Sequence, residues 1–232
     1  MSSSSPITQI KIVQSFEQLI NTPFGNGINA LCWERALSAD FTEVVAALSL
    51  CEEIITIEDA QLLNLSLSEA GQSAVHILLE DQRRLRDLGL SPVLDWIRTY
   101  PRDEDSRVPT DVYSFHADSA TVETDTFLCT YHGSPSEGIR NDESIRQIDI
   151  PQTRTTLLQE FGGEDNPDFD EYLKEACYHL HYAALPQAKP FSFGLGHLWR
   201  IAVDYPGCPV PPCIHRAPPN LPNHPPRLLL IS

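Results

Sequence analysis

Prolines concentrate near the C-terminal end of the chain, and their positions limit the kind of sheet that can form there. Nine of the 19 prolines lie between Pro206 and Pro226. Because proline has no backbone N–H, a continuous central strand cannot run through this segment, and rigid loops that flank short strands are favoured. Two proline-free runs remain, and we predict a strand for each, at residues 213–217 and 227–231.

The sequence pattern changes near residue 108. Before it, apolar residues recur at helical spacing over residues 38–50 and over 57–88, with an interruption near Gly71. A short helix is predicted for residues 92–100, and residues 28–33 are more typical of a strand. After residue 108 the pattern predicts one helix, at about 168–185, and further short strands at 112–116, 126–132, 145–150 and 198–204.

A helical layer ahead of many short strands indicates an α+β protein in which helices pack outside a β-sandwich or barrel. The length of 232 residues fits a single domain, with residues 1–107 as a mainly helical support region and 108–232 as the β-rich core. The apolar runs are too short to span a bilayer, and the first six residues lack the features of a secretory signal. We therefore expect a soluble, cytoplasmic protein.

Charge and cysteine content exclude some function classes. The 32 acidic residues against 16 basic ones give a formal net charge of -16, which repels nucleic acid, and no basic patch offsets it. The six cysteines are scattered, so reduced thiols are expected. Cys208 and Cys213 come closest to a metal-binding pair, but a structural zinc site needs a second pair.

The segment around His116 carries the first sign of chemistry. In an extended strand, residues two apart point to the same face, so His116 and Asp118 can present an imidazole and a carboxylate to one metal ion. The pattern His-x-Asp is short, and a histidine at a strand end beside a turn-capping aspartate is the other interpretation.

Two later residues strengthen the metal interpretation. His215 follows His116 by 99 residues, and Arg227 lies twelve residues beyond His215. A facial triad of two histidines and one carboxylate leaves three positions open on iron, enough for a bidentate 2-oxo acid and dioxygen. The planar guanidinium of an arginine then suits the far carboxylate of that acid better than a lysine does.

This order and spacing resembles the superfamily of iron(II)/2-oxoglutarate-dependent oxygenases, over residues 112–231. The resemblance implies a double-stranded β-helix (jelly-roll) core, with His116, Asp118 and His215 as ligands of Fe(II). It also implies that Arg227 binds 2-oxoglutarate, the co-substrate, and that the hydroxyl of Tyr131 contacts the same molecule. A packed core tyrosine is the alternative for Tyr131.

A second resemblance is narrower. Phe115-His-Ala-Asp118, Leu128-Cys-Thr-Tyr-His-Gly133, His215-Arg-Ala-Pro218 and Arg227-Leu-Leu-Leu230 are similar to segments of an uncharacterised family of bacterial domains. The chain departs from many oxygenases at residues 194–199, where those proteins have a Gly-Asp dipeptide ahead of the strand of the last histidine.

Further residues are candidates for neighbouring roles. Residues 133–140 are predicted to form an exposed turn, from which Glu137 and Arg140 would contact a polar substrate if the turn overhangs the pocket. Arg216, next to His215, is expected to point away from the metal. His132 and His197 are alternative ligands if the strand register differs.

The function expected from the resemblance is oxidation of an unactivated C–H bond by dioxygen, as hydroxylation, desaturation or cyclisation. A small molecule such as an amino acid or secondary metabolite is the expected substrate partner, with neither nucleic acid nor membrane involved. Three alternatives stay open: a protein side-chain hydroxylase, a jelly-roll metal protein that needs no 2-oxoglutarate, and a non-catalytic interaction module.

Overall fold

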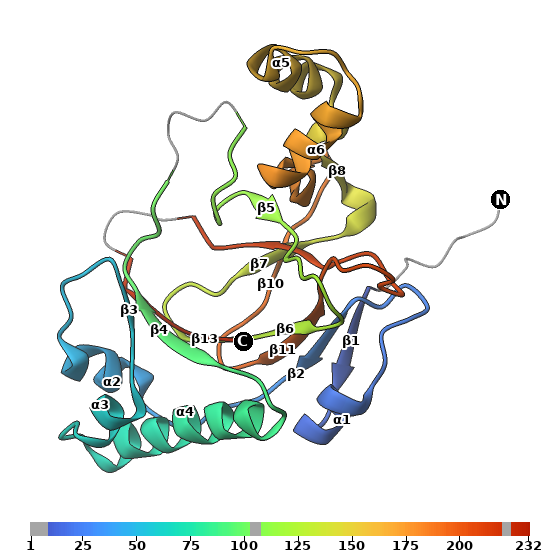
Figure 1. The fold of residues 1–232 in the computed structure, drawn as a ribbon. Coiled ribbons are helices and arrows are strands. Elements are labelled where there is room, and N and C mark those ends of the chain that lie inside the picture. The colour runs from blue at the N-terminus through green and yellow to red at the C-terminus, as the bar shows by residue number, and fades with distance from the viewer. Residues whose placement is uncertain (1–8, 103–107, 220–223) are drawn as a thin grey trace.

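Two largely antiparallel sheets form the body of the molecule in the computed structural model, which describes residues 9–102, 108–219 and 224–232 (Figure 1). Every strand pairing is antiparallel except that between β1 and β2. The larger sheet has the strand order β1 (Ile10–Val13), β2 (Ala30–Trp33), β11 (Leu198–Ala202), β6 (Asp125–His132), β13 (Arg227–Ile231), β4 (Val93–Ile97) and β3 (Ile54–Thr56). The smaller has the order β10 (Phe191–Ser192), β7 (Glu137–Ile139), β12 (Ile214–Arg216), β5 (Phe115–His116), β9 (His181–Ala184) and β8 (Ser144–Arg146).

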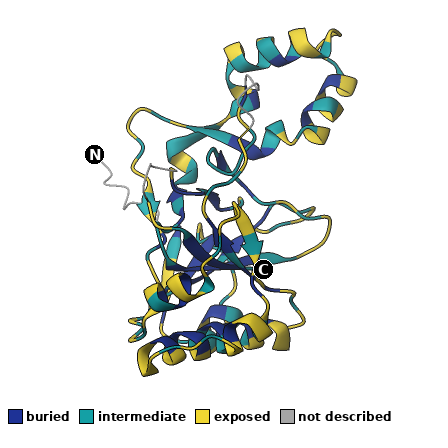
Figure 2. Cartoon of the chain, turned by 90° about the vertical axis from the view of Figure 1, so that its left-hand side faces the viewer, coloured by how far each residue is buried: buried dark blue, intermediate teal, exposed yellow. Residues whose placement is uncertain are grey.

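Six α-helices accompany the sheets in the described residues. Four come from the first half of the chain: α1 (Phe16–Asn21), α2 (Phe41–Leu48), α3 (Asp59–Leu63) and α4 (Glu69–Asp87). Their apolar sides share one buried cluster with the larger sheet, while their outer sides are exposed (Figure 2). The side chains of Asp40 and Ser68 accept hydrogen bonds from backbone N–H groups in the first turns of α2 and α4, which fixes where these helices begin.

The remaining two helices, α5 (Pro151–Phe161) and α6 (Pro167–Glu175), form a lobe beside the smaller sheet (Figure 1). A separate apolar cluster holds the lobe together, with Leu157 and Phe169 at its centre. Proline opens each helix, and Gly162 ends α5 with a φ of 70°, a conformation that glycine adopts without steric cost.

Alternation along β6 assigns its side chains to two environments. Phe127, Cys129 and Tyr131 belong to the cluster shared with the helices. Leu128 lies on the opposite face, in the cluster between the two sheets. Because successive side chains of a strand point to opposite faces, Thr126 and Thr130 share the side of Leu128.

Several predicted elements occur where the sequence places them. The strands predicted at 28–33, 126–132, 198–204, 213–217 and 227–231 correspond to β2, β6, β11, β12 and β13, and the helices predicted in 38–50 and 57–88 correspond to α2, α3 and α4. The mixed class of helices and strands is confirmed. No helix in the described part of the chain combines the length and the apolar character needed to cross a bilayer.

Other predicted elements are wrong. Residues 92–100 form no helix, because β4 lies there between β13 and β3. The helix predicted at 168–185 ends with α6, since Cys177 takes a left-handed conformation and residues 181–184 pair with β5 as β9. Before residue 108, the larger sheet also contains β1, β3 and β4, in addition to β2, the strand predicted there. Of the strands predicted at 112–116 and 145–150, only shorter parts form, as β5 and β8.

Candidate metal centre and its cavity

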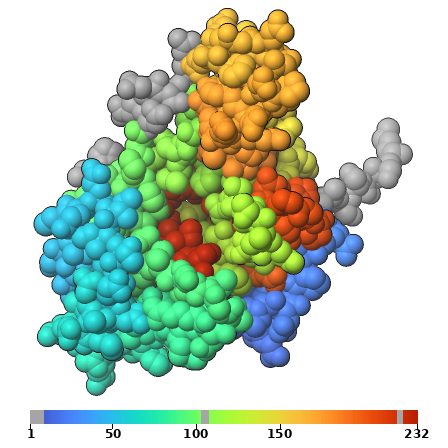
Figure 3. All heavy atoms as spheres, in the orientation of Figure 1, coloured from blue at the N-terminus to red at the C-terminus, as the bar shows by residue number. Residues whose placement is uncertain are grey.

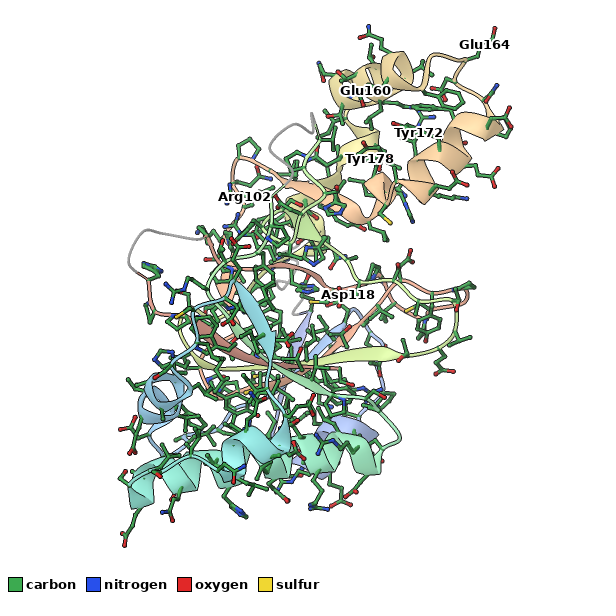
Figure 4. All side chains as sticks on the ribbon, turned by 60° about the vertical axis from the view of Figure 1, so that its left-hand side comes forward. Arg102, Asp118, Glu160, Glu164, Tyr172 and Tyr178 are labelled. Carbon is green, nitrogen blue, oxygen red and sulfur yellow. The ribbon has the colours of Figure 1, made fainter. Side chains whose placement is uncertain are left out.

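Three side chains converge between the sheets. His215 of β12 lies directly opposite His116 of β5, so both imidazoles point to the same face, with ring centroids 4.6 Å apart. Asp118 follows two residues after His116, and its backbone carbonyl accepts a hydrogen bond from the N–H of Asp204 at 2.8 Å. Its Oδ1 lies 3.9 Å from Nε2 of each histidine. Figure 4 shows Asp118 in the body of the molecule, below the lobe that carries Tyr172 and Tyr178.

These distances suit a shared metal ion. Two ligands that each bind at about 2.1 Å can be at most about 4.2 Å apart, and 3.9 Å lies inside that limit. Among the described residues, His116, Asp118 and His215 are the group of histidine, cysteine or acidic side chains whose ligand atoms lie close enough together to hold a metal. The cluster is therefore a possible metal-binding triad.

Each member of the triad is oriented by a hydrogen bond on its outer side. Nδ1 of His116 lies 2.9 Å from the carbonyl of Ser114, and Nδ1 of His215 lies 3.4 Å from the carbonyl of Cys213. A carbonyl can only accept, so both rings carry their proton on Nδ1 and leave Nε2 free to bind a metal. The hydroxyl of Thr126 donates to Oδ2 of Asp118 at 2.6 Å, which leaves Oδ1 facing the histidines.

The protonation states also suit metal binding. Burial, reinforced by the neighbouring His215, lowers the pKa of His116 to about 4, so this imidazole is neutral at physiological pH. Burial alone would raise the pKa of Asp118. The facing His215 and the hydroxyl of Thr126 outweigh it, and the pKa lies below its ordinary value. The triad thus presents a neutral imidazole at His116 and an ionised carboxylate at Asp118.

A third imidazole lies beside those of His116 and His215, on the next strand of the same sheet. His181 of β9 lies directly opposite His116, with ring centroids 5.8 Å apart, and is buried. The hydroxyl of Ser114 donates to the carbonyl of Asp111, so its oxygen accepts the Nδ1 proton of His181, 2.8 Å away. His181 therefore also keeps its Nε2 unprotonated. Burial lowers its pKa to about 4.

The triad lines a cavity of about 200 Å³ between the two sheets. Figure 3 shows the hollow on this side of the molecule, with the C-terminal strand β13 in red at its floor. Side chains of both sheets and of the segments between them line it: Asp95, Tyr100, Val112, His116, Asp118, Leu128, Ser136, His215, Ala217, Arg227, Leu229 and Ile231.

Arg227 brings a buried positive charge into the same cavity. Its guanidinium donates to the hydroxyls of Ser136 at 2.9 Å and Tyr100 at 3.2 Å, and more weakly to that of Thr130 at 3.4 Å. Its Nε is buried without a partner, and no carboxylate of the described residues forms an ion pair with it. Burial accordingly lowers the pKa of Arg227. The described residues therefore provide hydroxyl partners for this guanidinium but no anion to neutralise it.

Tyr131 lies on the wrong face of β6 for the predicted contact with the co-substrate. Its ring stacks on Phe41 of α2, and its hydroxyl donates to the buried carboxylate of Asp81 at 2.7 Å. The reason is the alternation of β6, which turns Thr130 toward Arg227 and Tyr131 toward the helices. The structure thus fits the alternative of a packed core tyrosine.

Glu137 and Arg140 do not reach the cavity. Residues 137–139 form β7 rather than an exposed turn, and Glu137 pairs with Arg216 at 2.6 Å on the outer face of the smaller sheet. Arg140 pairs with Asp142, 2.6 Å away. Arg216 points away from the triad, as expected.

The alternative ligands have other partners. Nδ1 of His197 accepts from the backbone N–H of Arg35, and His132 contacts the carbonyl of Pro226. Cys213 is buried, and the thiol of Cys208 donates to the carbonyl of Val210.

Four cavity residues escaped the sequence reasoning: Asp95, Tyr100, Thr130 and Ser136. The first two lie within residues 92–100, the segment predicted as a helix. A strand there, read by its alternation of Leu94 and Trp96 with Asp95 and Ile97, would have placed Asp95 on the cavity side. Alternation along β6 would likewise have selected Thr130 in place of Tyr131.

Comparisons of the chain with models of known protein families, with curated proteins and with solved structures found no match.

Proposed function

We propose that this chain is an iron(II)- and 2-oxoglutarate-dependent oxygenase. One observation carries the proposal: a two-histidine, one-carboxylate cluster shares a cavity with Arg227, a buried cation that lacks a carboxylate partner among the described residues. A metal protein without an anionic co-substrate has no use for such a cation, which is unfavourable to bury.

The donor set fits iron(II). Two imidazoles and one carboxylate on a single side leave further coordination positions open, as in non-haem iron oxygenases. When bound, the iron would supply the activation of dioxygen, coupled to oxidative decarboxylation of 2-oxoglutarate. The chain's contribution is to fix the ligands: Ser114 and Cys213 orient the rings through their carbonyls, and Thr126 orients the carboxylate.

The cavity fits a small dicarboxylic acid. Its volume of about 200 Å³ equals that of roughly seven water molecules at ~30 Å³ each. Arg227 offers its guanidinium to the carboxylate remote from the metal, where the hydroxyls of Tyr100 and Ser136 can share the same anion. Because the chain has a net charge of -16, a buried cation is needed to draw a dianion into this site.

The two facing antiparallel-rich sheets support a jelly-roll core, with the N-terminal helices outside it. The reaction we propose is oxidation of an unactivated C–H bond of a small molecule, because little space remains in the cavity once 2-oxoglutarate is bound. A protein side chain entering from the mouth is the alternative substrate.

A metal protein that uses no 2-oxoglutarate is a second candidate, and His181 favours it. With His116 and His215 it forms a row of three unprotonated Nε2 atoms on one sheet face. A third imidazole ligand would leave fewer positions for a 2-oxo acid. In that case Arg227 would not affect catalysis.

The decisive experiment is an anaerobic titration with Fe(II) and then 2-oxoglutarate, followed by the metal-to-ligand charge-transfer band of the chelate. We expect the band in the wild-type protein, its loss in His116→Ala and its retention in His197→Ala, the matched control. Folded protein that binds iron but shows no band would exclude the co-substrate assignment. Equal losses in the two variants would mean that a different imidazole holds the metal.

A further inference from the structure

The floor of the cavity continues outward as an open surface on the larger sheet. Strand register places Ile54, Thr56, Val93, Asp95 and Ile231 on the cavity side of β3, β4 and β13, and we call these five residues the mouth shelf. Asp95 lies opposite Leu229, and Val93 opposite Ile231, so the shelf continues directly from the row that contains Arg227. Asp95 and Ile231 themselves line the cavity.

The shelf is apolar except for one carboxylate and its partner. Ile54 and Val93 are 39% and 38% exposed, although both are large aliphatic residues in strands. Asp95 accepts a hydrogen bond from the hydroxyl of Thr56 at 2.6 Å. It forms no ion pair with any cation of the described residues. Four acids of the neighbouring helices α3 and α4 each do have an arginine partner: Asp59, Glu80, Asp81 and Asp87.

The two arginines near the shelf, Arg98 and Arg227, have partners other than Asp95. Arg98 follows Asp95 by three residues and therefore lies on the helix side of β4, where it stacks on Trp96 at 5.4 Å and donates to the carbonyl of Leu50. Arg227 is on the cavity side, but its donors are directed to Tyr100, Thr130 and Ser136. The negative charge of Asp95 is thus left for an occupant of the cavity mouth.

We infer that the mouth shelf binds the part of the substrate that does not react, and that this substrate carries a basic nitrogen on an apolar skeleton. The protonated nitrogen pairs with Asp95, and the skeleton packs on Ile54, Val93 and Ile231. The assignment of this ligand as substrate rests on the proposed oxygenase function; the binding site itself does not.

Charge decides between substrate classes. An anionic skeleton would meet both Asp95 and the field of a chain with net charge -16, and a neutral one would leave the carboxylate unpaired when it covers the shelf. A protonated amine is attracted both by Asp95 and by the negative net charge of the chain. The shelf therefore discriminates among compounds of equal apolar size by their charge.

Hexylamine and hexan-1-ol test this inference, because they share a skeleton and differ in charge at neutral pH. Their dissociation constants are measured by ligand-observed NMR on the metal-free full chain, and again with Zn²⁺ and 2-oxoglutarate present. We expect the amine to bind at least about tenfold more tightly, a difference of about 1.4 kcal/mol. Asp95→Asn, which keeps an acceptor for Thr56, should remove the preference. Glu53→Gln, the control at an exposed acid just before β3, should retain it.

Three results would overturn the inference: equal binding of the two compounds, a preference that survives Asp95→Asn, or one that Glu53→Gln abolishes equally. Raising the salt concentration tests it without any variant, since it should weaken the amine and leave the alcohol unaffected. If 2-oxoglutarate displaces the amine, Asp95 and Arg227 bind the two ends of one molecule and the separate shelf site is wrong. If the preference appears but 2-oxoglutarate does not bind, the shelf stands and the oxygenase proposal fails.

Discussion

Two buried arginines lie on opposite faces of the larger sheet and differ in how their charge is neutralised. On the helix side, Arg35 forms an ion pair with Asp81 at 2.6 Å, and both side chains are almost fully buried. It also donates to the carbonyl of Gly196 and the thiol of Cys129. On the cavity side, Arg227 has hydroxyl partners and an Nε without any partner.

The difference separates a buried charge that the chain itself neutralises from one that no described carboxylate neutralises. Burying an ion is costly unless a counter-charge and hydrogen bonds compensate for the lost water. Arg35 has that compensation within the chain, so it stabilises the packing of α4 on the sheet. Arg227 lacks it among the described residues, and we propose that an anion binds there.

The largest effect is expected when the complete pair is broken. Asp81→Asn leaves Arg35 buried without a counter-charge, and we expect the free energy of unfolding to fall by about 3–5 kcal/mol. Urea denaturation measures it. Glu80→Gln on the same helix should cost far less, because its partners Arg83 and Arg84 are 58% and 31% exposed. Similar losses in both variants would contradict the structural role of the buried pair.

Removing the buried arginine on the cavity side should affect stability differently from breaking the ion pair on the helix side. Arg227→Met removes a buried charge that has no counter-charge among the described residues. We therefore expect no loss of unfolding free energy in the metal-free protein, or a small gain. Calorimetry with Zn²⁺-loaded protein should show that 2-oxoglutarate binds about 100-fold more weakly or worse, while Zn²⁺ binding is unchanged. Destabilisation by more than about 2 kcal/mol would mean that Arg227 has a structural role like that of Arg35.

The tyrosines on the two faces provide a finer test. Tyr131→Phe removes a hydrogen bond to the buried Asp81 and should cost about 1.5–3 kcal/mol of stability without changing 2-oxoglutarate binding. Tyr100→Phe removes a partner of Arg227 and should weaken that binding with little effect on stability. The reverse pattern, seen in the same denaturation and calorimetry experiments, would place the co-substrate on the helix side.

Lowering the pH should destabilise the smaller sheet, which carries His116 and His181, before the larger one. His116 and His181 have pKa values of about 4, below the ordinary 6.5, so the unfolded chain binds these two protons at a higher pH than the folded one. The unfolding free energy of the metal-free protein should therefore fall as the pH drops from 6.5 toward 4. Hydrogen exchange should accelerate at β5 and β9 before β2. His181→Phe should reduce the pH dependence, and an unchanged profile would contradict the assignment.

Sequence patterns identified the parts of this molecule that depend on local periodicity. The apolar run of β13 and the capped helix α4 lie where predicted, because their hydrophobic spacing matches their pairing. Residues 93–97 were predicted as a helix since Pro92 and the apolar residues after it also suit a helix start. These residues form the strand β4 because they pair with β13 and β3, and no local sequence pattern encodes that pairing.

The site was predictable in its identity but not in its environment. His116, Asp118 and His215 were selected by spacing, and the structure brings them together. Tyr131 was assigned to the wrong face. Neighbouring residues of β6 point to opposite faces, and the sequence alone does not tell whether Thr130 or Tyr131 faces the cavity. That Arg227 has no carboxylate partner in the described part of the chain emerges only when residues distant in sequence are placed around it.

A crystal structure grown without oxygen, from protein soaked with Mn²⁺ and 2-oxoglutarate, tests the central claim most directly. We expect the ion on Nε2 of His116, Nε2 of His215 and Oδ1 of Asp118, with the far carboxylate of 2-oxoglutarate on the guanidinium of Arg227. An ion bound elsewhere, or an Arg227 that stays without an anion while the triad is filled, would contradict it.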